Sequence, residues 1–345
     1  MASPRIVSVA TAVPAALWPQ EAILERLAQH FPFYHNPRVR QIFLNSGIES
    51  RHLAMPPEKF GPDNTADNLH EVFKQCSVEL GKQAASQAMT QAGVGPAEID
   101  LIAVATSTGY LCPGLSARLA RELGLQGNLR RADLVGMGCA GAMPALQRAS
   151  DFVRAYPQKR ALAVTVEVSS ACWFVDQAME TVVGNAICAD GAAAVVISTS
   201  DSPGPRLESF ETLLDVSYLE SVGFSFEMGK NRIVLSGDLR YAAGPLVRQA
   251  VENLLAREGL SVDSIDDWVV HAGGRRVLDG IDAALGFTCH ELRHSRDILR
   301  THGNMSSPTV LFALQRTMEQ AQPGATGVMI ALGPGLAAEI ALLRW

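Results

Sequence analysis

The sequence predicts an α/β fold of two duplicated βαβαβ halves, stacked in a layered α-β-α-β-α arrangement. Three observations predict it. The chain has 345 residues, of which 48% are hydrophobic and 19% charged, so it can bury a large core. Apolar runs typical of buried strands alternate with amphipathic segments of helical period. A segment of the first half also recurs in the second, which indicates duplication.

The repeat aligns residues 83–106 with residues 249–272 without a gap. Each copy predicts an amphipathic helix, a glycine that ends it, a short polar loop and an apolar strand. A chance likeness between two ordinary βα units is the alternative explanation. Matching residues include Gln83 and Gln249, Gly93 and Gly259, Ile99 and Ile265, and Asp100 and Asp266.

The remaining elements follow in the same order in both halves, which extends the duplication along the chain. We expect an N-terminal half, residues 1–205, and a C-terminal half, residues 206–345, related by a pseudo-twofold axis. The helix after each turn should lie between the two sheets. The strand, turn and helix cover residues 133–155 and 300–320, the next strand covers 161–168 and 327–335, and the closing strand covers 192–198 and 337–343.

Charge and hydropathy exclude several classes of function. The net charge is -6 and no basic run stands out, so nucleic acid is not expected as a partner. No apolar stretch approaches the ~20 residues that span a bilayer. Residues 1–14 lack the features of a signal peptide, which predicts a cytoplasmic protein. The cysteines are scattered and are expected to be reduced thiols: Cys76, Cys112, Cys139, Cys172, Cys188 and Cys289.

Cys139 is the candidate nucleophile. It lies in residues 136–142, Gly-Met-Gly-Cys-Ala-Gly-Ala, where a strand ends, small residues permit a sharp turn and a helix starts. Free N–H groups at a helix N-terminus favour an anion, and the thiolate is the reactive form of cysteine. The alternative is a buried cysteine that packs as a small apolar residue. We prefer that reading for Cys76 and Cys289.

His271 and Asn304 are the candidate partners. The strand in residues 266–274 ends at His271, and Asn304 lies in a turn, residues 302–307, that takes the place of the cysteine turn in the second half. All three candidates therefore fall at strand ends on the same side of the sheets, where α/β proteins place their sites. Taken singly, His271 could be an ordinary hydrogen-bonded residue and Asn304 a turn residue.

These three side chains suit the chemistry of thioester condensation. A thiolate attacks a thioester and becomes acylated. A malonyl-type extender then loses carbon dioxide, and the oxygen of the resulting enolate needs hydrogen-bond donors. A His N–H and an Asn amide can supply them as an oxyanion hole does. The imidazole can also stabilise the thiolate as its ion-pair partner.

Several motifs occur together over nearly the whole chain. They are IFLNSGIESRHL from Ile42, GCAGAMPAL around Cys139, ICADGAAAVVI at Asp190, HAGGRRVLDGIDAALG from His271, GNMSSPTVLFAL from Gly303 and LGPGLAAE near the end. With these motifs the chain resembles the chalcone synthase-like, type III polyketide synthase family. The combination of HxGG and GNMSSPT is the most specific part of the resemblance.

The resemblance implies a homodimeric acyltransferase of the thiolase fold that uses acyl-CoA and malonyl-CoA and needs no metal or redox cofactor. It implies that Cys139 holds the growing chain, and that His271 and Asn304 bind the thioester carbonyl and drive malonyl decarboxylation. The expected reaction is decarboxylative Claisen condensation followed by cyclisation to a pyrone or resorcinol. Cavity volume, which composition does not report, sets the starter, the extender, the number of condensations and the mode of cyclisation.

The resemblance also implies a set of pocket residues. Cys188 and Ile233 stand where the plant enzymes have gatekeeper phenylalanines, and Cys172 where a pocket threonine is usual. We therefore expect an aliphatic rather than an aromatic starter. Cys112 stands where a methionine crosses the dimer interface. The full set expected to bind substrate is Cys172, Cys188, Ile233, Ser306, Gly333, Pro334 and Gly335.

The coenzyme A site departs from the family pattern. Arg38 matches one basic residue that contacts the coenzyme A phosphates, but Gln41 and Asn45 occupy the other basic positions. Arg40 is expected to compensate. The loss of the other cations leaves an acyl carrier protein as an alternative donor.

Two other functions stay open from the residues alone. One is a single-condensation ketosynthase, similar to the initiation ketosynthases of fatty-acid synthesis, that joins carrier-bound chains. The other is a catalytically silent partner subunit of the same fold. A metal site at Cys289, His290 and His294 is not favoured, because the cluster lacks a fourth ligand.

Overall fold

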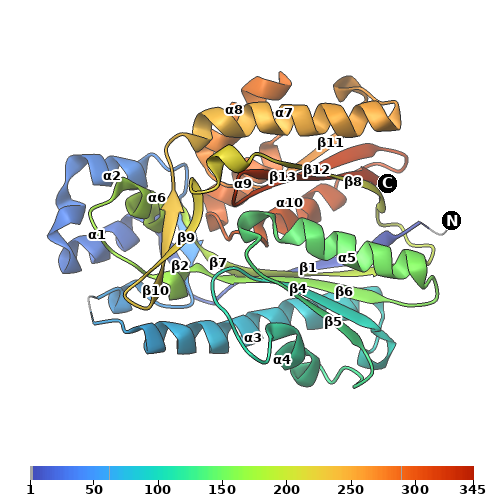
Figure 1. Cartoon of the computed structure of the whole chain (residues 1–345), viewed down its shortest axis with the longest axis horizontal. Coiled ribbons are helices and arrows are strands. Elements are labelled where there is room, and N and C mark those ends of the chain that lie inside the picture. The colour runs from blue at the N-terminus through green and yellow to red at the C-terminus, as the bar shows by residue number, and fades with distance from the viewer. Residues whose placement is uncertain (1–2, 62, 289) are drawn as a thin grey trace.

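The computed structural model describes residues 3–61, 63–288 and 290–345, and nine of the strands in these residues form one continuous sheet (Figure 1). The strands are β1 (Arg5–Ala12), β2 (Leu17–Pro19), β3 (Ser50–His52), β4 (Leu101–Ala105), β5 (Arg130–Leu134), β6 (Ala161–Val168), β7 (Asp190–Ser198), β8 (Arg206–Leu214), β9 (Val222–Glu227), β10 (Lys230–Leu235), β11 (Asp267–Val270), β12 (Thr326–Gly333) and β13 (Ala337–Arg344). The helices are α1 (Gln20–His30), α2 (Pro37–Leu44), α3 (Ala66–Ala92), α4 (Leu115–Glu122), α5 (Ala142–Ala155), α6 (Met179–Ile187), α7 (Leu239–Glu258), α8 (Arg275–Leu285), α9 (Arg293–His302) and α10 (Thr309–Met318).

The order of the strands shows the duplication. The sheet runs β11-β12-β13-β8-β1-β7-β6-β4-β5. In the first half, β1 pairs with β7, β7 pairs antiparallel with β6, and β6 pairs parallel with β4. In the second half, β8 pairs with β13, β13 pairs antiparallel with β12, and β12 pairs parallel with β11. One residue pair, Arg5 with Arg206, joins β1 to β8 and so joins the two halves. The predicted duplicated α/β fold is confirmed.

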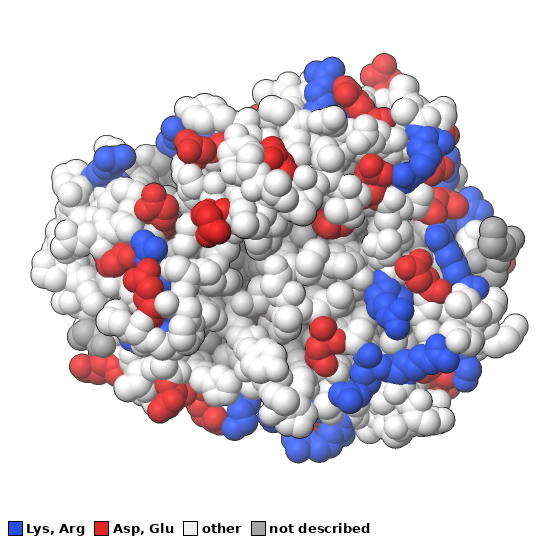
Figure 2. Space-filling model, viewed as in Figure 1, with Lys and Arg blue, Asp and Glu red and all other residues white. Residues whose placement is uncertain are grey.

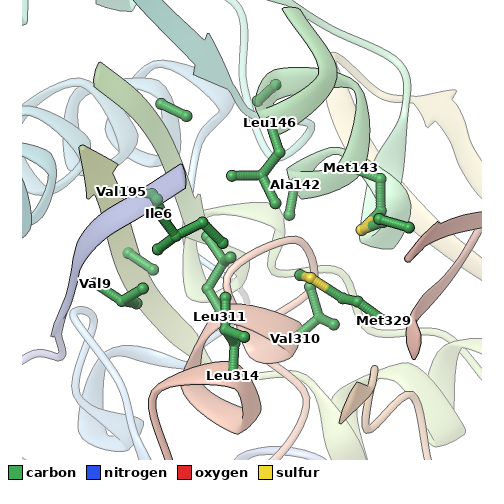
Figure 3. Close-up of a cluster of buried hydrophobic side chains, with 14 of the residues drawn as sticks. Ile6, Val9, Ala142, Met143, Leu146, Val195, Val310, Leu311, Leu314 and Met329 are labelled. Carbon is green, nitrogen blue, oxygen red and sulfur yellow. The ribbon is translucent and has the colours of Figure 1, made fainter. Parts of the chain in front are cut away.

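The halves stack in five layers, as Figure 1 shows. Helices α5 and α10 lie between the two half-sheets. Their apolar side chains, such as Leu146 and Leu311, meet Ile6 of β1, Val195 of β7 and Met329 of β12 in the central core (Figure 3). Helices α3 and α4 cover the outer face of the first half-sheet, and α7 and α8 cover that of the second. Strands buried on both faces explain the unbroken apolar runs in the sequence.

The repeat extends to single hydrogen bonds. Gly93 and Gly259 end α3 and α7 in the left-handed conformation, with φ of 64° and 67°. The carboxylate of Asp100 accepts from the N–H of Arg160 at 3.0 Å, and that of Asp266 accepts from the N–H of Thr326 at 2.8 Å. These equivalent bonds tie the start of β4 to that of β6, and the start of β11 to that of β12. We propose that the halves divide at residues 205 and 206, between β7 and β8.

A cap outside the duplication covers one end of the sheets. Helices α1, α2 and α6 share their own apolar cluster, and the β9–β10 hairpin packs against α6. On the face shown in Figure 2, charged side chains of both signs lie mostly toward the periphery, around a largely uncharged central area. Among the described residues, no helix is both long and apolar enough to cross a membrane.

Candidate active site

Cys139 lies on a short 3-10 helix, Gly138–Ala140, in the connection from β5 to α5. The α-helix itself begins at Ala142, so the thiol precedes it rather than starting it. A Cβ at Gly138 would lie 2.5 Å from the Pro334 ring, and Gly138 has a φ of 49°, so only glycine suits this position. The turn from Gly333 to Gly335 therefore packs directly against the cysteine turn.

The thiol is neutral in the resting protein. Burial raises the pKa of the Cys139 thiol to about 11, and the nearby Glu167 carboxylate also raises it. Hydrogen bonds from the side chains of Ser306 and Asn304 lower that pKa. Residues of the second half thus reach the sulfur and favour its anion, although burial dominates.

Asn304 is fixed by bonds to both halves. Its N–H donates to the carbonyl of Ile187 at 2.8 Å, and its carbonyl accepts from the N–H of Ala189 at 2.8 Å. Its Nδ2 donates to the Gly273 carbonyl at 3.0 Å, and its Oδ1 accepts from the N–H of Ser306 at 2.8 Å. These bonds orient the amide. An Nδ2 group has two hydrogens, so one stays available beside the thiol.

Ser306 has a strained backbone at this turn. Its φ of 58° is in the left-handed region, which residues other than glycine rarely adopt. Such strain is concentrated at functional sites because the surrounding structure must hold it. Here the conformation places the N–H of Ser306 on Asn304 and its hydroxyl near Cys139.

His271 directly follows β11 and is buried. Its N–H donates to the carbonyl of Ile330 at 2.8 Å, which fixes the backbone. Neither ring nitrogen has a hydrogen-bond partner among the described residues. Burial lowers the pKa of His271 to about 4, so the imidazole is neutral at pH 7. A neutral ring with free nitrogens can accept a proton or donate to a substrate oxygen.

Gly273 connects the two second-half candidates. Its N–H donates to the His271 carbonyl at 3.0 Å, and a Cβ on it would lie 3.2 Å from His271 Nε2. Its own carbonyl holds the Asn304 amide. The structure thus brings Cys139 to the Asn304 side chain and links His271 to Asn304 through Gly273.

Glu167 is a functional candidate that the sequence analysis did not identify. It lies near the end of β6 and is fully buried. One oxygen, Oε2, accepts from the N–H of Ser107 at 2.9 Å and from the N–H and hydroxyl of Thr108 at 3.1 and 2.9 Å. The other accepts from the Ser307 hydroxyl at 2.7 Å. A lone acidic residue in the apolar run ALAVTVEV was the available signal.

The Glu167 carboxylate connects the turn of Cys139 to the turn of Asn304. Ser307 belongs to the turn of Asn304, and the Ser107 hydroxyl accepts from the N–H of Gly138 at 2.8 Å, beside Cys139. Burial raises the pKa of Glu167 to about 7, against the lowering effect of its hydrogen bonds. Its charge therefore changes near neutral pH.

The predicted pocket residues Cys172, Cys188 and Ile233 line one small cavity of about 30 Å³, together with Trp173 and Phe224. Cys188 forms an isolated β-bridge with Asn304, so the cavity lies beside the Asn304 turn. Burial raises the pKa of the Cys188 thiol to about 12, and its closeness to Cys139 adds to the effect. We call this cavity the acyl chamber.

A second cavity of about 550 Å³ lies between α2 and the start of α8. Its lining includes Gly273, whose carbonyl holds the Asn304 amide, so it reaches the candidate catalytic residues. We call it the donor cavity. Arg40 does not line it, because its guanidinium pairs with Glu25 at 2.7 Å. The lining is Arg38, Gln41, Ile42, Asn45, Ser46, Met179, Glu180, Val183, Ile187, Leu235, Ser236, Gly237, Leu239, Arg240, Gly273, Gly274, Arg275, Arg276 and Val277.

The remaining predicted residues lie elsewhere. Cys112 is exposed, as are the neighbouring Tyr110 and Val135 at the end of edge strand β5. Cys289, part of the disfavoured metal cluster, lies outside the described residues. Within the described part of the chain, no group of three or more His, Cys, Asp or Glu residues could hold a metal ion.

Comparisons with known proteins point to one family. The model of the FAE1/type III polyketide synthase-like family matches residues 26–209, and that of the chalcone and stilbene synthase C-terminal domain matches residues 219–345. A 3,5-dihydroxyphenylacetyl-CoA synthase of Amycolatopsis balhimycina is 33% identical over 99% of this chain and 93% of its own length. An alpha-pyrone synthesis polyketide synthase-like protein of Mycobacterium tuberculosis is 31% identical over 97% and 89%. The crystal structure of PKS-I from the brown alga Ectocarpus siliculosus superposes with a TM-score of 0.93, at 29% identity over 99% and 98% of the two chains.

Proposed function

Because the chain belongs to the type III polyketide synthase family, we propose that Cys139, His271 and Asn304 are its catalytic residues. The enzyme is an acyltransferase of the thiolase fold. It joins malonyl-type thioesters to an acyl starter by iterative decarboxylative Claisen condensation and cyclises the product. The packing of the Cys139 turn against the Asn304 turn, drawn from opposite halves of the duplication, carries the assignment of residues. A Cβ on Gly141 would lie 3.3 Å from Ser307 Cβ.

The first step loads the starter. Cys139 Sγ attacks the thioester carbonyl, the carbon–sulfur bond to the donor breaks, and the starter becomes a thioester of Cys139. The Sγ proton passes to a free imidazole nitrogen of His271 and then to the departing thiolate. The His271 ring is neutral and its nitrogens have no partner among the described residues, so one of them has a lone pair free to accept the proton.

The second step makes the carbon–carbon bond. The malonyl carboxylate leaves as carbon dioxide, and its electron pair moves into an enolate. The second hydrogen of Asn304 Nδ2 and a ring N–H of His271 stabilise the enolate oxygen. The carbon end then attacks the acyl-Cys139 carbonyl and releases the thiolate for the next round. These steps are polar, and the proposed residues carry them without a metal or redox cofactor.

The acyl chamber supports a short aliphatic starter. Its volume is about 30 Å³, and its walls carry the small side chains of Cys172 and Cys188 beside Ile233. A coumaroyl-sized group would need more space than this cavity offers, although Trp173 and Phe224 also line it. The cysteines must stay reduced for Cys139 to act, which supports a cytoplasmic enzyme.

A homodimer is the proposed assembly. Strand β5 lies at the edge of the sheet with its backbone free to pair, and Tyr110, Cys112 and Val135 are exposed nearby. An unpaired edge beside exposed apolar side chains favours pairing with a second chain. Acyl-CoA and malonyl-CoA are the proposed substrates.

Mass spectrometry of the products tests this function. Wild type, supplied with malonyl-CoA and a set of short acyl-CoA starters, should form cyclised products with two or more malonyl-derived units. Cys139→Ala should form none above background, because the thiol that would carry the growing acyl chain is missing. A product with a single extender unit would favour a single-condensation ketosynthase. No product, with Cys139 as unreactive toward iodoacetamide as the other cysteines, would favour a silent subunit.

A further inference from the structure

Arg51 is a buried cation outside the proposed catalytic set. It lies in strand β3, opposite Trp18 of β2, and is only 2% exposed. Burial lowers the pKa of its guanidinium to about 10, so Arg51 is still charged at pH 7. Every hydrogen-bond partner of this guanidinium in the structure is a neutral oxygen. Because a buried cation is costly unless its donors are satisfied, these partners indicate what Arg51 does.

The Arg51 guanidinium binds the C-terminal end of α6. Its Nη1 donates to the carbonyls of Asn185 and Cys188, at 2.9 and 2.6 Å. Its Nε donates to Gln20 Oε1 at 2.9 Å, and Gln20 Nε2 donates to the Ala186 carbonyl at 2.7 Å. The last carbonyls of a helix have no partner within the helix, and the helix dipole makes this end negative. Arg51 and Gln20 together therefore cap α6.

Asn304 binds the same segment through the backbone groups that Arg51 leaves free. The N–H of Asn304 donates to the Ile187 carbonyl, and its own carbonyl accepts from the N–H of Ala189, both at 2.8 Å. The backbone of residues 185–189 thus lies between Arg51 and Asn304 in one continuous chain of hydrogen bonds. These bonds hold the backbone of Asn304 and leave its side-chain amide for the reaction.

Gly303 brings the Arg51 side chain against the same turn. A Cβ on Gly303 would lie 2.9 Å from Arg51 Cγ and Cδ, and 3.0 Å from the Ile187 carbonyl oxygen. Gly303 also has a φ of 76°, which glycine adopts without strain. Arg51 therefore reaches the Asn304 turn by two routes, through packing at Gly303 and through the carbonyls at the end of α6.

We propose that Arg51 is a positioning residue, which sets the place of the Asn304 amide for malonyl decarboxylation. This inference rests on the proposed function, in which Asn304 Nδ2 stabilises the enolate oxygen. Without the guanidinium the end of α6 loses its cap and shifts, and the Asn304 backbone shifts with it. A displacement of about 1 Å in a reacting group costs about 10²-fold in rate. Cys139 lies in a different connection, β5 to α5, so starter loading should depend much less on Arg51.

Two half-reactions of Arg51→Met test the proposal. Methionine keeps the unbranched stem that packs at Gly303 and removes the donors. In carbon dioxide release from malonyl-CoA, kcat should fall about 10- to 100-fold while KM stays within about threefold, because binding is not disturbed. Acylation of Cys139 by a short acyl-CoA, followed by intact-protein mass spectrometry, should stay within about threefold of wild type. Partial unfolding would lower both half-reactions equally, so the split between them identifies a positioning role.

The Arg51→Met/Asn304→Ala double variant shows whether Arg51 acts through the amide. Residues that act through one contact are not additive, so carbon dioxide release should lie within about twofold of that of Asn304→Ala alone. Arg154→Met is the matched control. The Arg154 guanidinium likewise binds two backbone carbonyls, those of Leu207 and Glu208, but from the last turn of α5. This variant should release carbon dioxide at the wild-type rate.

Wild-type release by Arg51→Met, or an equal loss in both half-reactions, overturns the proposal. A further full loss in the double variant also overturns it, because Arg51 would then act directly from the acyl chamber, which it lines. Should circular dichroism show that Arg51→Met does not fold, Arg51→Lys takes its place. Lysine exchanges the forked donors for a single ammonium, and the same split between half-reactions is expected. Undiminished release by Asn304→Ala would refute the proposed role of Asn304 itself.

Discussion

At the scale of single residues, the resting site keeps its nucleophile uncharged. Burial holds the Cys139 thiol and the His271 imidazole in their neutral forms at pH 7, with pKa values of about 11 and about 4. We therefore expect the thiolate to form only during attack, as the proton moves to His271, and not before substrate arrives. This separates Cys139 from a cysteine activated by a helix N-terminus, because α5 starts only at Ala142.

Glu167 adds a dependence on pH to the same thiol. Its pKa of about 7 lies above the ordinary value for glutamate, so it is neutral below pH 7 and charged above it. The charged form raises the pKa of Cys139. The carboxylate thus opposes the thiolate only on the alkaline side of pH 7.

Glu167→Gln should therefore make Cys139 easier to alkylate, but only at higher pH. At pH 8.5 we expect iodoacetamide to label Cys139 about tenfold faster in the variant, since a nearby charge of the same sign is removed. At pH 5.5 the two rates should agree, because Glu167 is already protonated in wild type. Peptide mass spectrometry measures both rates, with Cys139→Ala as the blank. The same rate ratio at both pH values would contradict this assignment.

At the scale of elements, the β9–β10 hairpin closes the acyl chamber because Gly184 lets it pack closely against α6. A Cβ at Gly184 would lie 2.2 Å from Ile233 Cγ2, so the strand can approach the helix only where glycine stands. Ile233 pairs in register with Phe224, and both line the chamber. The contact between α6 and β10 therefore sets the chamber's size.

Gly184→Ala should push β10 away from α6. We expect an unfolding free energy lower by about 1–3 kcal/mol, the usual effect of overpacking, and a higher relative kcat/KM for longer acyl starters. Urea unfolding and competition between starters of two lengths measure these effects. Gly127→Ala is the control, because a Cβ there meets nothing within 4 Å. Unchanged stability together with an unchanged preference would show that this contact does not limit the chamber.

At the scale of the whole molecule, duplication explains why a thiol of the first half and an amide of the second half meet. The fold was predictable because its signals are local: glycine stops at Gly93 and Gly259, paired aspartates at Asp100 and Asp266, and apolar runs at fixed spacing. The turns of Cys139 and Asn304 were predictable in the same way, from small residues at strand ends.

Side chains whose partners lie far along the chain were not predictable. Arg40 matches a basic pattern in sequence, yet Glu25 of the preceding helix engages it. Arg275 and Arg276 follow the HAGG motif, and their place in the lining of the donor cavity depends on how α8 packs relative to α2. Glu167 likewise acquires its role from Ser107 and Ser307, which belong to different halves.

Carbon dioxide release from malonyl-CoA tests most directly whether the two halves form one active site with different roles. In this account the first half carries the acyl group and the second half stabilises the enolate. Cys139→Ala should still release carbon dioxide, because His271 and Asn304 stabilise the enolate, but it should form no carbon–carbon bond. Asn304→Ala should release it about 10²- to 10³-fold more slowly, the usual effect of losing an oxyanion donor, while Cys139 still becomes acylated. Full release by Asn304→Ala, or none by a folded Cys139→Ala, would contradict the account.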